Sequence, residues 1–237
     1  MTEEEWVEEA DERASKRMLD FIIQTSAKPI DEIEKEQSRK LRLFACAACR
    51  RLWRLMINAQ SQALVEVAER YADGRATPTE LRVAADANAA TELPSGGMGQ
   101  EYLPIYGAYM YVSRAVYWLS DADIPSVVGL LIDDLYGATV NDPDDPEEEH
   151  IHQAALLRDI FANPLRPVAF DAAWRTDTAV SLAKGMYESR DFGVMPILAD
   201  ALQDAGCDSE DVLNHCRDPE QTHVRGCWVV DLVLGKS

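Results

Sequence analysis

Apolar residues recur at helical spacing along most of the chain, and the alternation typical of strands is nearly absent. In the first segment Trp6, Ala10, Ala14 and Met18 follow one another at four-residue steps between charged residues, which predicts an amphipathic helix over residues 1–25. The same reasoning predicts helices over residues 33–57, 60–72, 77–93, 102–119, 125–136, 147–161, 171–189, 194–205, 209–216 and 223–234. The pattern therefore predicts an all-α protein, a multi-helix bundle or array.

Turn and capping residues indicate where several of these helices begin and end. Gly74 and Gly137 each follow a periodic segment, at a position that favours a residue tolerant of positive φ, so each is expected to end a helix. Thr77 and Glu80 have the spacing of a capping box, which marks a helix start. For residues 228–234 a buried strand would show the same pattern, and the helical context favours a helix.

Two irregular stretches divide the chain. Residues 94–99 are rich in glycine and predict a linker or surface loop, and residues 141–146 form an acidic connector interrupted by prolines. The expected regions are an N-terminal helical region (1–93), a middle region with the linker, aromatic central helices and connector (94–149), and a C-terminal helical region (150–237). The alternatives are two packed helical halves and a single domain.

Charge narrows the classes of partner. The 237 residues include 42 acidic and 23 basic side chains, and the net charge is −19. This field repels phosphate polymers and anionic bilayers, so general nucleic-acid binding and membrane association are not expected. The longest apolar stretch, near residues 100–119, is interrupted by charged residues and proline, and it is unsuited to spanning a membrane.

Compartment follows from the first residues and from the cysteines. The first ten residues carry five glutamates and no basic residue, the reverse of a signal peptide. Five cysteines are an odd number, which favours reduced thiols or metal ligands over a disulfide framework. We therefore expect a cytoplasmic protein.

Most of the residues that bind soft metals lie near the C-terminus. His223 and Cys227 are four residues apart and would share one face of a helix. His215 and Cys216 end the preceding helix, so all four side chains could converge on one tetrahedral zinc ion. The alternative is a core role, because cysteine is often buried and the paired spacing of zinc knuckles does not occur here.

A second candidate site is a basic sector on the helix predicted over residues 33–57. Projected at helical spacing, its members are Arg39, Lys40, Arg50, Arg51 and Arg54. Such a sector suits a phosphate or an acidic partner surface, and the alternative is pairing with carboxylates of the chain itself, the nearest being the glutamates of the first helix. Cys46 and Cys49 project onto the apolar side and are expected to be core residues.

Several motifs resemble those of a family of uncharacterised bacterial proteins. The resembling stretches are LRLFACxxCRR at 41–51, LRDIFxNPxRP at 157–167, MPILADAL at 195–202, HCR at 215–217 and HVRGCW at 223–228. The resemblance implies no activity, ligand or catalytic residue. It marks His215, Cys216, His223 and Cys227 as family features, which suits a shared core and a shared site equally.

Catalytic patterns are scarce. The chain has four histidines, so general acid–base chemistry has few carriers, and it contains neither a P-loop nor a nucleophile-elbow pattern. We expect a non-catalytic protein that binds another protein through its acidic surface or a helical groove. One alternative is a zinc-binding protein that uses the C-terminal histidines and cysteines. Another is a DNA mimic whose carboxylates take the place of phosphates on a DNA-handling enzyme.

Overall fold

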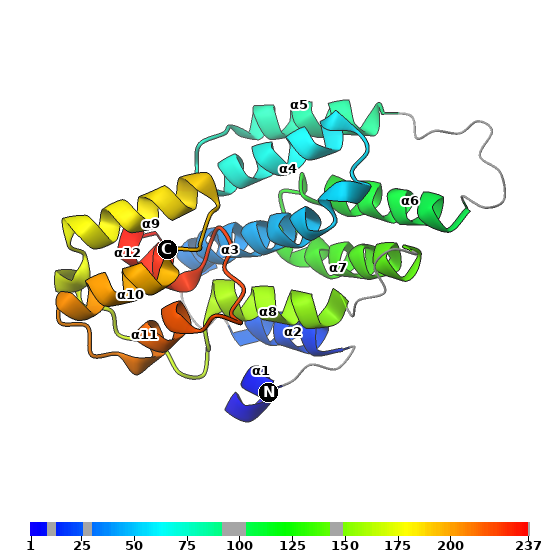
Figure 1. Cartoon of the computed structure of the whole chain (residues 1–237). Coiled ribbons are helices and arrows are strands. Elements are labelled where there is room, and N and C mark those ends of the chain that lie inside the picture. The colour runs from blue at the N-terminus through cyan, green and yellow to red at the C-terminus, as the bar shows by residue number, and fades with distance from the viewer. Residues whose placement is uncertain (9–12, 26–29, 92–102, 143–148, 237) are drawn as a thin grey trace. The chain divides into compact units, whose positions relative to one another are not determined.

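The computed structural model describes residues 1–8, 13–25, 30–91, 103–142 and 149–236 (Figure 1). Every regular element in these residues is a helix, which confirms the all-α prediction. Within them, none of the helices combines the length and the apolar character needed to cross a bilayer. The chain forms two compact units, here called the central unit (Ala10–Ala154) and the C-terminal unit (Met1–Glu9 with Ala155–Ser237). The described part of the middle region 94–149 thus belongs with the helices that precede it.

The central unit packs around a long helix, α3. Its elements are α2 (Ala14–Thr25), α3 (Ile30–Arg51), η1 (Trp53–Leu55), α4 (Ala59–Ala72), α5 (Pro78–Ala89), α6 (Leu103–Trp118), α7 (Ile124–Val140) and the start of α8 (Glu149–Phe161). Leu41, Phe44 and Cys49 of α3 are fully buried, and this helix packs on α4 and α7. The buried Arg42 donates hydrogen bonds to the carbonyls of Leu119 and Asp121, just beyond α6, and so satisfies groups that the helix end leaves free.

The predicted helix ends are confirmed at two places and wrong at a third. Gly74 has a φ of +67° directly after α4, and Thr77 and Glu80 form the capping box at the start of α5. Gly137 does not end α7 but lies inside it. A Cβ at this position would come within 2.8 Å of the ring of Tyr111, which explains the need for glycine. The glycine therefore serves the close approach of α6 and α7.

The C-terminal unit consists of short helices around its own core (Figure 1). Its elements are α1 (Glu3–Glu8), the remainder of α8, η3 (Ala172–Trp174), α9 (Asp177–Ser189), α10 (Met195–Asp204), α11 (Glu210–Arg217) and α12 (Trp228–Leu234). Helix α9 packs on α10 and α12, and α11 packs on α10 and α12. Buried side chains such as Met186, Leu198 and Val230 fill the space between them.

Several predicted helices are shorter or divided in the structure. The helix expected over 171–189 is divided into η3 and α9, and the helix expected over 33–57 ends at Arg51, before η1. The helix expected over residues 1–25 is replaced by α1 and α2, and residues 9–12 lie outside the described part. The helix expected over 223–234 begins only at Trp228, because Gly226 has a φ of +98°, which right-handed helices do not contain. The linker expected at 94–99 and most of the acidic connector also lie outside the described residues.

Candidate metal centre

Four side chains with metal-binding atoms lie together in the C-terminal unit. Asp159 belongs to α8, His215 to α11, and Cys227 directly precedes α12, while His223 lies in the irregular segment between α11 and α12. One candidate ligand atom from each lies within 4.8 Å of all the others. This four-residue cluster is thus assembled from two helices, α8 and α11, and from the segment that leads into α12.

The separations within the cluster resemble those around a tetrahedral ion. Asp159 Oδ1 lies 3.2 Å from His215 Nε2 and 3.0 Å from His223 Nδ1. Cys227 Sγ lies 3.2 Å from His215 Nε2 and 4.0 Å from His223 Nδ1. Zinc bonds of about 2.0–2.3 Å place tetrahedral ligand atoms about 3.3–3.8 Å apart. Small shifts of the side chains would therefore complete a coordination shell.

The cluster is withdrawn from water and contains a buried charge. Asp159 and Cys227 are fully buried, and the side chains of His215 and His223 are 9% and 8% exposed. Burial raises the pKa of Asp159, whereas hydrogen bonds from the two histidines lower it. The lowering prevails, so the pKa of Asp159 lies below its usual value. Asp159 is therefore a carboxylate held in the interior by its neighbours.

The contacts of Cys227 do not suit a nucleophile. Burial, and then the charge of Asp159, raise the pKa of the Cys227 thiol well above its usual value. In a catalytic relay, one imidazole joins the acid and the nucleophile through its two different nitrogens. Here His215 uses Nε2 for both Asp159 and Cys227, and His223 likewise uses Nδ1 for both. The side chains converge on a point, which is the geometry of metal coordination.

Outer hydrogen bonds orient the cluster. The amide of Val224 donates to Asp159 Oδ2 over 2.9 Å, which leaves Oδ1 directed at the histidines. The indole Nε1–H of Trp228 donates to His215 Nδ1 over 3.2 Å. His223 Nε2 is buried without a hydrogen-bond partner among the described residues. The first two contacts fix the orientation of the Asp159 carboxylate and of the His215 ring.

The structure brings three of the four predicted zinc ligands together: His215, His223 and Cys227. It does not bring Cys216 among them; that side chain lies in the core, where burial raises its pKa to about 12. The prediction that His223 and Cys227 share a helix face is wrong, since His223 precedes α12 in an irregular segment. The fourth member is Asp159, which the zinc prediction did not include, although it lies within the LRDIFxNPxRP stretch at 157–167.

The basic sector on α3 and η1 is engaged within the central unit. The ion pairs are Arg39–Asp73 (3.2 Å), Arg50–Glu69 (2.5 Å), Arg51–Glu149 (3.2 Å) and Arg54–Asp142 (2.5 Å). The carboxylate side chains of these pairs are at most 2% exposed. Four arginines therefore neutralise buried acids, while Lys40 is partly buried nearby in sequence. Cys46 and Cys49 are buried, as expected for core residues.

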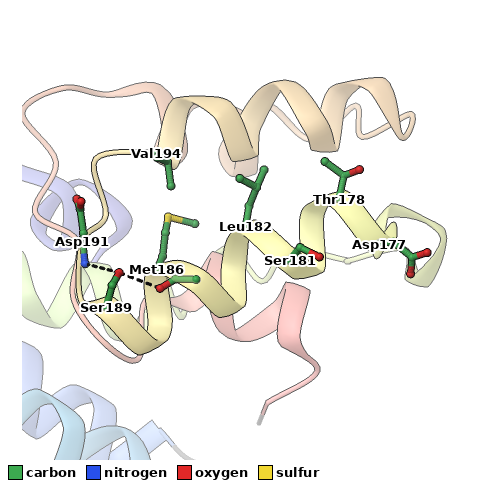
Figure 2. Close-up of a pocket in the computed structure, with 9 residues that line it drawn as sticks. Asp177, Thr178, Ser181, Leu182, Met186, Ser189, Asp191 and Val194 are labelled. Carbon is green, nitrogen blue, oxygen red and sulfur yellow. Dashed lines mark hydrogen bonds between the residues drawn. The ribbon is translucent and has the colours of Figure 1, made fainter.

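A groove of about 740 Å³ runs along α9 in the C-terminal unit. Figure 2 shows Ser181, Leu182 and Met186 of α9 on one side and Val194 on the other. The amide of Asp191 closes one end by donating to Ser189 Oγ over 3.1 Å. No member of the four-residue cluster is among the described residues that line it. The groove and the cluster are therefore separate features.

No protein-family model, curated protein or solved structure matches this chain. The family resemblance of the motifs therefore stays a prediction.

Proposed function

We propose that this chain is a zinc-binding protein whose four-residue cluster holds one Zn²⁺ and thereby stabilises the C-terminal unit. The observation that carries the proposal is the convergence of ligand atoms from Asp159, His215, His223 and Cys227 within 4.8 Å of one another. Their sequence separation makes this convergence informative, because α8 and α11 are far apart along the chain.

The types of ligand favour zinc. Two imidazole nitrogens, one sulfur and one carboxylate oxygen suit a borderline-soft ion of tetrahedral preference, whereas Mg²⁺ and Ca²⁺ take six or more oxygen ligands. A thiolate from Cys227 and the carboxylate of Asp159 together carry the charge that offsets a divalent cation. With neutral histidines, the occupied site is electrically neutral, which suits its buried position.

The number of ligands favours a structural role. Four protein ligands fill a tetrahedral shell and leave no position for a reactive water, which catalytic zinc sites retain. The ion would join α8, α11 and the start of α12. Because α11 has 8 residues and α12 has 7, neither helix is long enough to be stable alone. A zinc ion with a filled shell therefore supports a structural rather than a catalytic role for the metal.

The test compares two neighbouring cysteines in the full chain. Metal content is measured on the wild type, Cys227→Ser and Cys216→Ser after purification without added chelator. We expect about one zinc per chain in the wild type and in Cys216→Ser, and a loss of most zinc in Cys227→Ser, because only Cys227 belongs to the cluster. Both thiols are buried, so the pair is matched for the cost of a core hydroxyl.

A spectroscopic arm covers the case in which a variant folds poorly. The metal-free wild type is titrated with Co²⁺, whose thiolate charge-transfer band and tetrahedral d–d bands report sulfur in the shell. Asp159→Asn is expected to retain the sulfur band and to bind more weakly, since an amide replaces the anionic oxygen. Substoichiometric zinc below about a tenth of an equivalent, together with no tetrahedral cobalt spectrum, would contradict the proposal.

A further inference from the structure

The hydrogen bond between Trp228 and His215 determines where His215 carries its proton. An indole N–H is a donor only, so His215 Nδ1, 3.2 Å away, must be the acceptor. A neutral imidazole has one N–H, which therefore lies on Nε2. That N–H faces Asp159 Oδ1 and Cys227 Sγ, each 3.2 Å from Nε2. The three hydrogen bonds of His215 are thus mutually consistent.

Metal binding requires the opposite tautomer. His215 approaches the cluster through Nε2, and this nitrogen must give up its proton to coordinate an ion. The neutral ring then has its N–H on Nδ1, directly opposite the indole N–H of Trp228. Two donors in this position repel each other, so either the indole or the imidazole has to turn.

We propose that Trp228 is a positioning residue that weakens zinc binding at the four-residue cluster by holding His215 in the tautomer unable to coordinate. This inference rests on the proposed zinc function. Trp228 would influence zinc affinity without being a ligand, because it contacts the His215 ring and would not contact the ion.

The surroundings of Trp228 make the hydrogen bond to His215 costly to break. Trp228 is 7% exposed, so an indole N–H that loses its acceptor finds little water in exchange. Its ring lies against the His215 ring, with centroids 5.0 Å apart and planes inclined by 51°, which restricts how far either ring can turn. Trp228 is also the first residue of α12 and directly follows Cys227. Zinc binding is therefore coupled to a movement at the start of that helix.

The experiment measures zinc affinity in the full chain by competition with a chromophoric chelator. The variants are Trp228→Phe and, as a matched control, Trp174→Phe, which removes an indole of similar burial that packs edge-to-face against Phe170. We expect Trp228→Phe to bind zinc about three- to tenfold more tightly than the wild type, because the variant has no hydrogen bond to His215 that must break when zinc binds. This factor corresponds to the contribution of one neutral hydrogen bond. Trp174→Phe should leave the affinity unchanged.

A second readout follows the indole itself. The Trp228 indole N–H resonance, assigned by its loss in Trp228→Phe, should move upfield when zinc is added to the wild type, because its acceptor is removed. Equal or weaker zinc binding by Trp228→Phe would overturn the inference, and the zinc function would stand. No zinc binding by the wild type would overturn both. Circular dichroism checks that both variants keep the helical content of the wild type.

Discussion

Two glycines inside α7 provide a sharp test of how α6 and α7 pack. Gly129 and Gly137 both lie within this helix, where glycine is ordinarily less favourable than alanine by about 1 kcal/mol. A Cβ at Gly129 would meet nothing within 4 Å. A Cβ at Gly137 would lie 2.8 Å from Cδ1 and Cε1 and 3.1 Å from Cγ of Tyr111. The two substitutions to alanine therefore share one benefit and differ in one cost.

The cost at Gly137 follows from those distances. Carbon atoms in contact normally lie about 3.5–4.0 Å apart, so the Tyr111 ring must move by several tenths of an ångström or more. Rotation of the ring about its own axis leaves Cγ in place, and the ring also packs under Arg114, 5.1 Å from its centroid. Overpacking of this kind costs about 1–3 kcal/mol, which exceeds the gain in helix propensity of about 1 kcal/mol.

The assay is thermal and urea unfolding followed by circular dichroism. We expect Gly129→Ala to stabilise the central unit by up to about 1 kcal/mol and Gly137→Ala to destabilise it by about 1 kcal/mol. A difference of about 2 kcal/mol corresponds to a separation of several degrees between the midpoints. Equal stabilisation by both alanines would refute the close packing of Tyr111 on α7. If Gly137→Ala is no longer destabilising in a Tyr111→Ala background, the cost lies in that contact.

Two further predictions concern buried charge and buried thiols. Arg50→Met should lower the free energy of unfolding by about 2 kcal/mol, because it removes the cation beside the buried Glu69. Lys16→Met should change it by less than about 1 kcal/mol, since Lys16 and Asp133 are both half exposed. Urea unfolding of both variants measures the difference, and equal effects would contradict the distinction between buried and exposed pairs. Burial raises the pKa of Cys216 to about 12, so its reactive thiolate form becomes abundant only near that pH. Labelling of Cys216 with a thiol reagent at pH 8 should therefore be slow in the folded chain and fast in denaturant. Rapid labelling of the folded chain would refute the burial of Cys216.

The fold was predictable where local chemistry decides it. Helical periodicity and the signals at Gly74, Thr77 and Glu80 act within a few residues, and the structure confirms them. Gly137 has the same local signature as a helix end, but the neighbouring Tyr111 on another helix determines its role. A local sequence pattern does not report a contact with another helix. Only the packed structure therefore distinguishes a glycine that ends a helix from one that allows two helices to approach closely.

The cluster was predictable only in part, for a related reason. His215, His223 and Cys227 are conspicuous because few soft ligands occur in the chain. Asp159 is one of 42 acidic residues, and nothing in its immediate surroundings separates a buried carboxylate from a solvated one. Conversely, Cys216 is adjacent to His215 in sequence but points into the core, since neighbouring residues of a helix face different directions.

The hydrogen bonds around Asp159 bear on how the C-terminal unit folds relative to zinc binding. Small zinc domains are commonly unfolded without the ion, because nothing else neutralises their ligands. Here Asp159 accepts hydrogen bonds from both histidines and from the Val224 amide, and the helices enclose a core of their own that includes Leu198 and Val230. The unit can therefore fold before it binds zinc, and zinc would replace the hydrogen bonds among these side chains by coordination bonds. The ion then contributes the difference between the hydrogen-bonded and the coordinated cluster, which is smaller than the full free energy of coordination.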